Sequence, residues 1–270
     1  MAQPFCQPGD VAGNLARMEP LVREAAAAGA RLVLFSEGGV TGYEDAARSL
    51  DRVVTLGDAT CTALHDMARR HRVVIAAGFM EREGQYRHIT HGMFYPDGRF
   101  GFQRKAGLGP PENGMADYRP GPVERTVFEV EGVRCAISIC ADSGLPRLWE
   151  RLQEAGVQLH LCPSAGCGKR SWGFTEASLA DPAVLDNYIQ KVDTIISVKD
   201  AIRSCIRYRI AAATCNQMAD DGVGYFHPGH SCIIDRTGEL AALIPGTFVF
   251  EHLRPRVAWG DISSAGQSGL

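Results

Sequence analysis

The hydrophobic positions of the chain follow two spacings, one typical of helices and one typical of buried strands. Near the start, apolar residues recur at positions 15, 18, 22 and 25, which lie on one face of a helix. Asn14 is a suitable cap for this helix, and Gly29 ends it. Pro20 falls inside the segment and indicates a kink or a later start. The apolar run over residues 31–35 then predicts a short buried strand.

The same order of helix and strand continues to the end of the chain. Asp58 is placed to cap a helix that runs to residue 71, and residues 96–98, Pro-Asp-Gly, supply the turn of a hairpin. The other predicted elements are strands over 73–77, 92–95, 99–103, 126–130, 133–139, 157–162, 210–215, 230–235 and 239–243, and helical segments over 145–155 and 183–206. This alternation predicts an α/β fold with a mixed or parallel sheet.

Composition restricts the classes of function. Of the 270 residues, 45% are hydrophobic and 22% charged, and the formal net charge is −3, which is ordinary for a globular protein with a large core. We expect a single domain over residues 1–270. No block of Lys or Arg stands out, so we expect no nucleic-acid or membrane partner. Neither a bilayer-spanning run nor a signal-peptide pattern is present, so we expect a cytoplasmic protein. Nine cysteines without repeating spacing indicate reduced thiols.

Four polar residues share one kind of position, directly after an apolar strand. They are Glu37, Cys140, Ser164 and Asn216. In open α/β folds, ligands bind at the carboxyl ends of the strands. Turns after strands are often polar for no functional reason, so each of these positions is a weak signal when taken alone.

Cys140 has two readings. It is either a small buried core residue, which is the common fate of a free cysteine, or a nucleophile. A cysteine at a strand-to-helix turn can have its thiolate stabilised by the dipole of the following helix. The backbone N–H of Ala141 would then face the oxygen of a reacting carbonyl.

A nucleophile needs a base and an oxyanion donor. Glu37 is either a solvated turn residue or a buried carboxylate whose raised pKa lets it carry protons near neutral pH. Lys105 and Glu112 are surface residues by default. None of the eight histidines stands in a context that suggests a Cys–His dyad, which favours Glu37 as the base.

Two other kinds of site are excluded by spacing. The segment 166–171, Gly-Cys-Gly-Lys-Arg-Ser, resembles a phosphate-binding loop, but Pro163 stands where the first glycine of that motif belongs. The cysteine pairs at 135/140 and 162/167 are each five apart and lack both CxxC spacing and a histidine cluster, so we expect no zinc.

The order of three segments resembles that of the nitrilase superfamily of carbon–nitrogen hydrolases. The resemblance runs over nearly the whole chain and is specific because all three segments occur in the family's order. They are residues 30–37 with Thr41-Gly42-Tyr43 as the glutamate segment, residues 100–108 as the lysine segment, and residues 132–142 as the nucleophile segment. The closing strands of the family are matched by 216–217 and 229–235.

The resemblance implies a four-layer αββα sandwich and a role for each residue. Cys140 would attack the carbonyl and form an acyl-enzyme, and Glu37 would take its proton and later activate water. Lys105 and the N–H of Ala141 would hold the oxyanion, and Glu112 resembles the auxiliary glutamate of several branches. No metal and no organic cofactor are implied. Members of the family usually self-associate, so a homodimer or a larger homo-oligomer is expected.

The resemblance also favours one class of small-molecule substrate. Nitrile-cleaving branches typically follow the nucleophile with Trp-Glu, whereas amidase-like branches often have a small or aromatic residue and then Asp, as in Ala141-Asp142. An amide or N-carbamoyl bond is therefore expected. The expected substrate-binding residues are Tyr43, Ala141, Asp142 and Ser164. Asp142 could instead simply cap the following helix.

Three alternatives to this function stay open. They are hydrolysis of a small nitrile, transfer of the acyl group to an amine, and a catalytically silent binding protein on the same fold. Intact Glu37, Lys105 and Cys140 disfavour the silent protein. The transferases that act on lipoproteins usually carry transmembrane helices, which the sequence does not predict.

Overall fold

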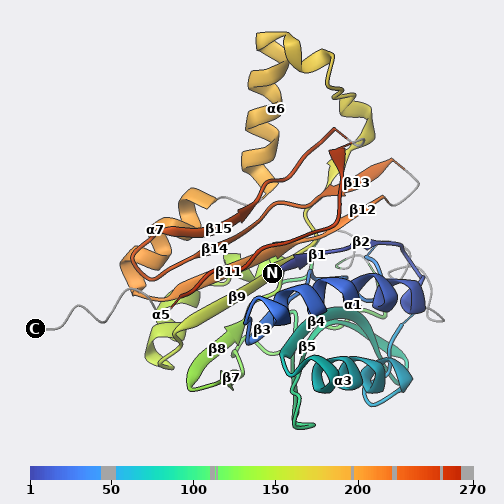
Figure 1. The fold of residues 1–270 in the computed structure, drawn as a ribbon, viewed down its shortest axis with the longest axis vertical. Helices are drawn as coiled ribbons and strands as arrows, with labels where there is room; N and C mark the ends of the chain where they lie inside the picture. Colours follow the sequence, from blue (N-terminus) through green and yellow to red (C-terminus); the bar gives the residue numbers. More distant parts are fainter. Residues whose placement is uncertain are drawn as a thin grey trace, which may run out of the picture.

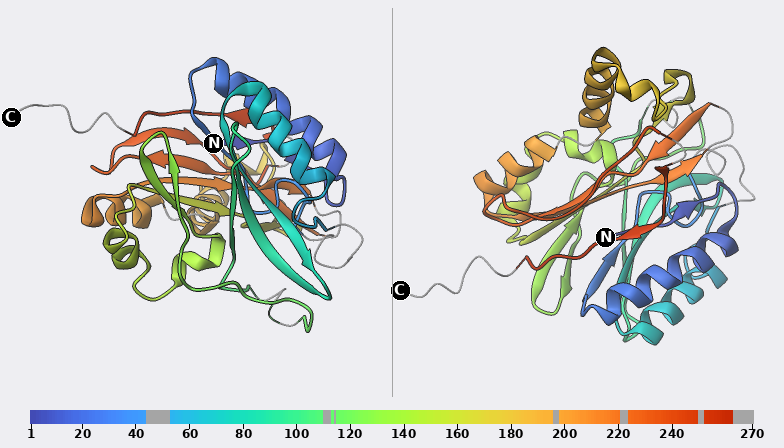
Figure 2. Two further views of the ribbon diagram at one scale, coloured as in Figure 1. Left: turned by 90° about the horizontal axis from the view of Figure 1, so that it is seen from below. Right: turned by 45° about the horizontal axis from the view of Figure 1, so that its top comes forward.

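Two β-sheets lie face to face and are covered by helices on their outer faces (Figure 1). The structure is a computed structural model, and it describes residues 1–43, 53–109, 113, 115–195, 198–220, 224–249 and 252–262. Figure 2 shows the helical layers on opposite sides of the paired sheets. This is the αββα sandwich that the sequence predicts, so the predicted fold is confirmed.

The first sheet has four strands in the order β3-β4-β5-β6. Strand β3 is parallel to β4, and the other pairs are antiparallel. The strands are β3 (Leu32–Leu34), β4 (Val74–Glu83), β5 (Tyr86–Phe94) and β6 (Phe100–Arg104). Strands β4 and β5 extend well beyond the ranges expected from their apolar runs, because their pairing continues to Glu83 and Tyr86.

The second sheet has six strands in the order β15-β14-β11-β9-β8-β7. Its centre, β8-β9-β11, is parallel, and its edges are antiparallel. The strands are β7 (Val127–Val130), β8 (Val133–Ile137), β9 (Leu159–Ser164), β11 (Ala211–Asn216), β14 (Ser231–Ile234) and β15 (Leu240–Ile244). Because β8, β9 and β11 are parallel, their carboxyl ends lie at one edge of the sheet.

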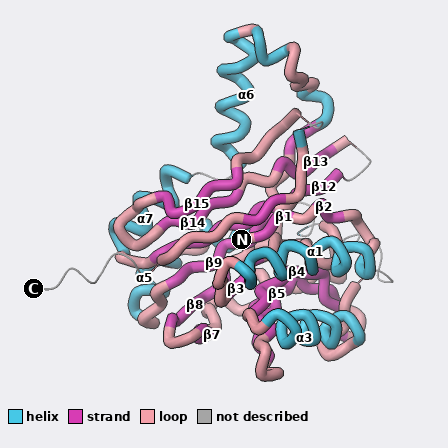
Figure 3. The backbone as a smooth tube through the Cα atoms, in the orientation of Figure 1, coloured by secondary structure: helices cyan, strands magenta, loops and turns pink. Residues whose placement is uncertain are grey.

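Short strands extend the sandwich at one end (Figure 3). A further four-stranded sheet has the order β10-β13-β12-β2, and β1 pairs with β16. These strands are β1 (Ala2–Gln3), β2 (Phe5–Cys6), β10 (Gly168–Lys169), β12 (Met218–Asp220), β13 (Tyr225–Pro228) and β16 (Arg256–Val257).

Each outer face of the sandwich is covered by a pair of helices. Helices α1 (Val11–Ala27) and α3 (Ala59–His71) pack on the four-stranded sheet, while α5 (Leu148–Glu154) and α7 (Val198–Tyr208) pack on the six-stranded sheet. Helix α6 (Pro182–Ile195) projects from the body (Figure 1). Between the sheets lies an aliphatic core that includes Leu34, Ile137 and Leu161.

The ends of two helices differ from the sequence prediction. Helix α1 begins at Val11 and is capped by Asp10, whose side chain accepts from the N–H of Gly13. Asn14, predicted as the cap, is fully buried and donates to the carbonyl oxygens of Gln7 and Val40. Helix α5 begins only at 148, because residues 140–144 form a 3₁₀ turn first. The predicted cap at Asp58 is confirmed.

Candidate active site

The three residues of the predicted catalytic set come from both sheets. Glu37 follows β3 and Lys105 follows β6, so both belong to the four-stranded sheet. Cys140 follows β8, in the six-stranded sheet. The two sheet edges meet here, because the N–H of Glu37 donates to the carbonyl oxygen of Ser164, 3.4 Å away at the end of β9.

Glu37 and Lys105 form a buried ion pair. The Nζ of Lys105 donates to Oε1 of Glu37 at 2.7 Å. The side chain of Lys105 is 1% exposed and that of Glu37 is 0% exposed. The second carboxylate oxygen of Glu37, Oε2, is buried and has no hydrogen-bond partner among the described residues. A buried oxygen without a donor is a ready acceptor for a proton brought by a neighbouring group.

The backbone at Cys140 is unusual. Its φ is +49°, in the left-handed region that residues other than glycine rarely adopt. Such conformations cluster at functional sites, where the surrounding structure holds them. The backbone N–H of Ala165 faces the thiol, and Glu37 and Lys105 both act on it electrostatically. Cys140 therefore lies in the electrostatic field of a carboxylate and an ammonium.

The environment of Cys140 keeps its thiol protonated. Burial and the negative charge of Glu37 raise the pKa of the Cys140 thiol, and the Lys105 ammonium only partly opposes them. The turn that follows Cys140 is a 3₁₀ turn over residues 140–144, and the α-helix expected there begins only at Leu148. A protonated thiol needs a base before it can attack.

Lys105 keeps its charge in this buried setting. Burial by itself lowers the pKa of the Lys105 ammonium, but opposing interactions, of which the negative charge of Glu37 is the largest, outweigh it, and the pKa lies above its ordinary value. The Nζ also lies 5.8 Å from the centroid of the Tyr43 ring. Tyr43 is itself buried and meets the ring of His227 edge-on. The site thus holds a fixed positive charge beside the nucleophile.

Ala141 and Ser164 lie close to the nucleophile, as the sequence predicts, and their roles stay predictions. Ala141 is exposed at the start of the 3₁₀ turn. Ser164 is buried, and its carbonyl oxygen accepts from both Glu37 and Gln217. The side-chain amide of Gln217 is buried without a partner among the described residues.

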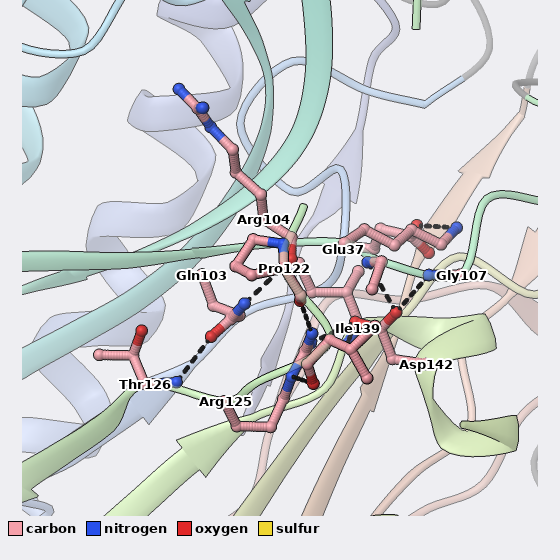
Figure 4. A network of polar contacts seen from close by, with 12 residues as sticks. Glu37, Gln103, Arg104, Gly107, Pro122, Arg125, Thr126, Ile139 and Asp142 are labelled. Carbon is pink, nitrogen blue, oxygen red and sulfur yellow. Dashed lines mark hydrogen bonds and ion pairs between the residues drawn. The ribbon is translucent and has the colours of Figure 1, made fainter. Parts of the chain in front are cut away.

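Asp142 differs from the sequence prediction of a substrate-binding residue. Its side chain is 0% exposed, and both of its carboxylate oxygens accept from protein donors. One of these donors is the guanidinium of Arg125, a residue that the sequence analysis did not single out. Both residues are labelled in Figure 4. No local motif marks Arg125, since the pair joins positions 17 apart in the sequence.

Glu112 lies outside the described residues, so its predicted auxiliary role stays a prediction. We expect substrate specificity to depend on the loops 41–48, 107–119, 164–180 and 217–228, and parts of the first, second and fourth also lie outside the described residues. Within the described ranges, no group of three or more His, Cys, Asp and Glu side chains is arranged to hold a metal ion. No helix of the described chain is long and apolar enough to cross a membrane.

Comparison with known proteins shows the family. The sequence profile of the carbon–nitrogen hydrolases matches residues 1–248. The chain is 26% identical to citrullinase from Francisella tularensis subsp. tularensis over 267 residues, 92% of this chain and 88% of that protein. It is 29% identical to a nitrilase from Pyrococcus abyssi over 56% of this chain and 58% of that one. It is 26% identical to N-carbamoylputrescine amidase from Solanum tuberosum over 60% of this chain and 56% of that one.

The fold has close counterparts among solved structures. An amidase from Nesterenkonia sp. AN1 superposes with a TM-score of 0.70 at 20% identity, covering 91% of this chain and 87% of that chain. At this identity the likeness shows the fold. With the family match over most of the sequence, the chain belongs to the carbon–nitrogen hydrolase family and is a hydrolase of the nitrilase superfamily.

Proposed function

We propose that the protein hydrolyses a non-peptide C–N bond of a small amide or N-carbamoyl substrate through a cysteine acyl-enzyme. The observation that carries this proposal is the state of Glu37. Lys105 holds one oxygen of its carboxylate, and the other is buried, unpartnered and close enough for its charge to act on Cys140. A base in this position suits a nucleophile that is protonated at rest.

The first half of the reaction forms the acyl-enzyme. The thiol of Cys140 passes its proton to Oε2 of Glu37 as the sulfur attacks the carbonyl carbon. The carbonyl π electrons move to oxygen, and the oxyanion is held by Nζ of Lys105 and the N–H of Ala141. When this adduct collapses, the C–N bond breaks and the leaving nitrogen takes the proton from Glu37. Ammonia or an amine departs, and a thioester remains.

The second half of the reaction consumes water. Glu37, now ionised, takes a proton from water as the oxygen attacks the thioester carbon. The same donors hold the second oxyanion, and its collapse returns the proton to the sulfur of Cys140. Glu112 is proposed as an auxiliary carboxylate in these steps. The charge of Lys105 favours each oxyanion over the neutral carbonyl, which is how a fixed charge lowers a barrier.

Several relatives support a C–N bond of the amide type. They include a citrullinase and an N-carbamoylputrescine amidase, and the Nesterenkonia amidase carries a Michael adduct of acrylamide at its active-site cysteine. Nitrilases also occur among the relatives, so hydrolysis of a small nitrile is the second candidate. The residue pair after the nucleophile, Ala141-Asp142, favours the amide side.

The test compares matched amide, N-carbamoyl and nitrile versions of the same carbon skeletons. Release of ammonia or amine and steady-state kcat/KM are measured, with Cys140→Ala as the blank. We expect the amide or N-carbamoyl compound to be turned over and the blank to be inactive. A nitrile turned over faster than its amide, with carboxylic acid as the main product, would establish the second candidate. Retained activity in the blank would reject the cysteine mechanism.

A further inference from the structure

The carboxylate of Asp142 joins three separate segments of the chain (Figure 4). Its Oδ1 accepts from the backbone N–H groups of Ala106, at 2.9 Å, and Gly107, at 2.7 Å. Its Oδ2 accepts from the N–H of Ile139, at 2.9 Å, and from Nη1 of Arg125, at 2.8 Å. Both oxygens are therefore committed to protein donors.

These bonds flank two of the proposed catalytic residues. Ile139 directly precedes Cys140, and Ala106 directly follows Lys105. The two segments are also in contact, because a Cβ added at Gly107 would lie 3.1 Å from the carbonyl oxygen of Ala141. One side chain thus fixes the nucleophile turn of the six-stranded sheet against the lysine segment of the four-stranded sheet.

The backbone on either side of Arg125 is hydrogen-bonded to the lysine segment, which holds Arg125 in place. The N–H of Thr126 donates to Oε1 of Gln103 at 2.8 Å, and the N–H of Gly121 donates to the carbonyl oxygen of Lys105 at 2.7 Å. The guanidinium also donates to the backbone carbonyl oxygens of Pro122 and Val123. Its side chain is 4% exposed, so Arg125 is a buried cation with a defined position.

The charges of the pair depend on one another. A buried carboxylate without a cation is strongly destabilised, so removing one partner of a buried pair leaves the other charge uncompensated. Burial lowers the pKa of the Arg125 guanidinium, and the charge of Asp142 opposes this. Arg125 also interacts electrostatically with Glu124, Arg151 and His160. Asp142 interacts electrostatically with Lys105 and Cys162.

We propose that Arg125 and Asp142 are a positioning pair that sets the separation of Cys140 and Lys105 in the reaction, an inference that rests on the proposed function. A simple helix cap would need only the bond to Ile139. The bonds to Ala106 and Gly107 cross between the sheets and have no capping role. Neither side chain of the pair is placed to touch substrate, so the pair acts through the backbone on either side of the nucleophile and the lysine.

The kinetic test replaces the cation. Arg125→Met leaves Asp142 without its cation, and a misplacement of the reacting groups by about 1 Å can cost on the order of 10²-fold. We expect kcat to fall about 10- to 100-fold while KM stays within a few-fold. Arg125→Lys keeps a cation beside Asp142 and should lose only a few-fold in kcat. Arg203→Met, on the outer surface of α7, is the matched control and should behave as the wild type.

The conservative variant separates positioning from a loss of packing. Arg125→Met and Arg125→Lys both remove the guanidinium, but only Arg125→Lys keeps a positively charged donor for Oδ2 of Asp142. An equal loss of kcat in both variants would overturn the proposal.

A measurement without substrate distinguishes this proposal from the proposed function. The rate of iodoacetamide alkylation at Cys140 is followed by mass spectrometry as a function of pH. The charge of Lys105 lowers the pKa of the Cys140 thiol, so a larger separation of the two residues raises it. Below the pKa of the thiol, each unit of increase in that pKa slows alkylation about tenfold. We expect Arg125→Met to react more slowly than the wild type, and Arg125→Lys and Arg203→Met to react at the wild-type rate.

The outcomes are separable. Altered alkylation in Arg125→Met with no hydrolysis of any substrate by the wild type would reject the proposed function and retain the positioning pair. Wild-type alkylation and wild-type kcat in a folded Arg125→Met would overturn the pair. If that variant does not fold, Arg125→Lys decides: a change confined to KM, or a fall in kcat of about 10-fold or more, would overturn the proposal.

Discussion

The Nζ of Lys105 lies 2.7 Å from Oε1 of Glu37, and solvent reaches neither side chain. Two opposite charges that are buried together cannot be changed independently, because each offsets the desolvation of the other. The same contact orients the carboxylate, so that its free oxygen is left for proton transfer. Substitutions at either position therefore test both chemistry and charge balance.

Glu37→Gln should abolish proton transfer while keeping the shape of the side chain. General acid–base groups typically contribute about 10²–10⁴-fold, so kcat should fall by at least that range while the protein stays folded. Glu154→Gln, at an exposed ion pair on α5, is the matched control and should leave kcat unchanged. Activity of Glu37→Gln within a few-fold of the wild type would reject Glu37 as the base.

Lys105→Ala should remove the fixed charge that holds the oxyanion. Loss of one oxyanion donor typically lowers turnover by about 10²–10³-fold, and kcat should fall more than KM rises. Steady-state kinetics on the best substrate checks this, with Lys199→Ala on α7 as the control. An effect confined to KM would instead make Lys105 a substrate anchor.

Cys140 should be the first of the nine cysteines to be alkylated at neutral pH. Cys6, Cys135 and Cys205 are at most 1% exposed, so the reagent does not reach their thiols. Cys140 is partly exposed, and a base and a cation lie beside it. Limited iodoacetamide treatment followed by peptide mass spectrometry gives the order of labelling. Labelling of another cysteine first, with activity retained, contradicts the assignment.

The positions of most of the longer helices and strands could be predicted from apolar spacing, because buried strands and helix faces leave direct periodic signals. The start of α1 could not. Asn14 is a good cap by residue type, but tertiary bonds to Gln7 and Val40 bury it, and Asp10 caps the helix. The start of α5 was also predicted too early, because the segment after Cys140 first forms a 3₁₀ turn.

The site was predictable only in part. Local pattern placed Cys140 at a strand end but could not distinguish a nucleophile from a core cysteine, and the family resemblance supplied the distinction. The contact between Lys105 and Glu37 joins positions 68 apart. The link from Asp142 to Ala106 joins positions 36 apart. Such pairings depend on how the two sheets pack, which periodicity does not encode. Self-association and the role of Glu112 stay predictions.

Asp58→Ala should destabilise the protein through the start of α3. The Asp58 carboxylate accepts from the N–H groups of Thr60 and Cys61, which otherwise lack partners in the first turn. Loss of such a cap typically costs about 0.5–2 kcal/mol of unfolding free energy. Asp66→Ala, which removes only an exposed ion pair in the same helix, should cost at most about 0.5 kcal/mol. Urea denaturation compares them, and equal effects would contradict the cap.

His160 should make the protein less stable in acid. Burial, followed by the charge of Arg125, lowers the pKa of its ring to about 4, and neither ring nitrogen has a partner among the described residues. The unfolded chain takes up a proton near pH 6.5 and the folded chain only near 4, so stability falls as pH drops between these values, by about 1.4 kcal/mol per pH unit.

His160→Phe should remove this pH dependence. The ring packs edge-on against Trp149, and phenylalanine keeps that contact. Urea unfolding at pH 7, 6 and 5 should show the difference between the variant and the wild type growing in favour of the variant as pH falls. Parallel curves for the two proteins would show that His160 does not titrate on unfolding.

Because Glu37 and Lys105 belong to one sheet and Cys140 to the other, the reacting distance is a distance between two layers of the sandwich. The core between the layers is apolar and non-directional, so the alignment of the two sheets at the site depends on the few hydrogen bonds that cross between them, among them those of Asp142 and Glu37. Heat should thus misalign base and nucleophile before it unfolds the chain. The temperature of half-inactivation should lie below the melting temperature, and a cross-link between the sheets should bring the two together.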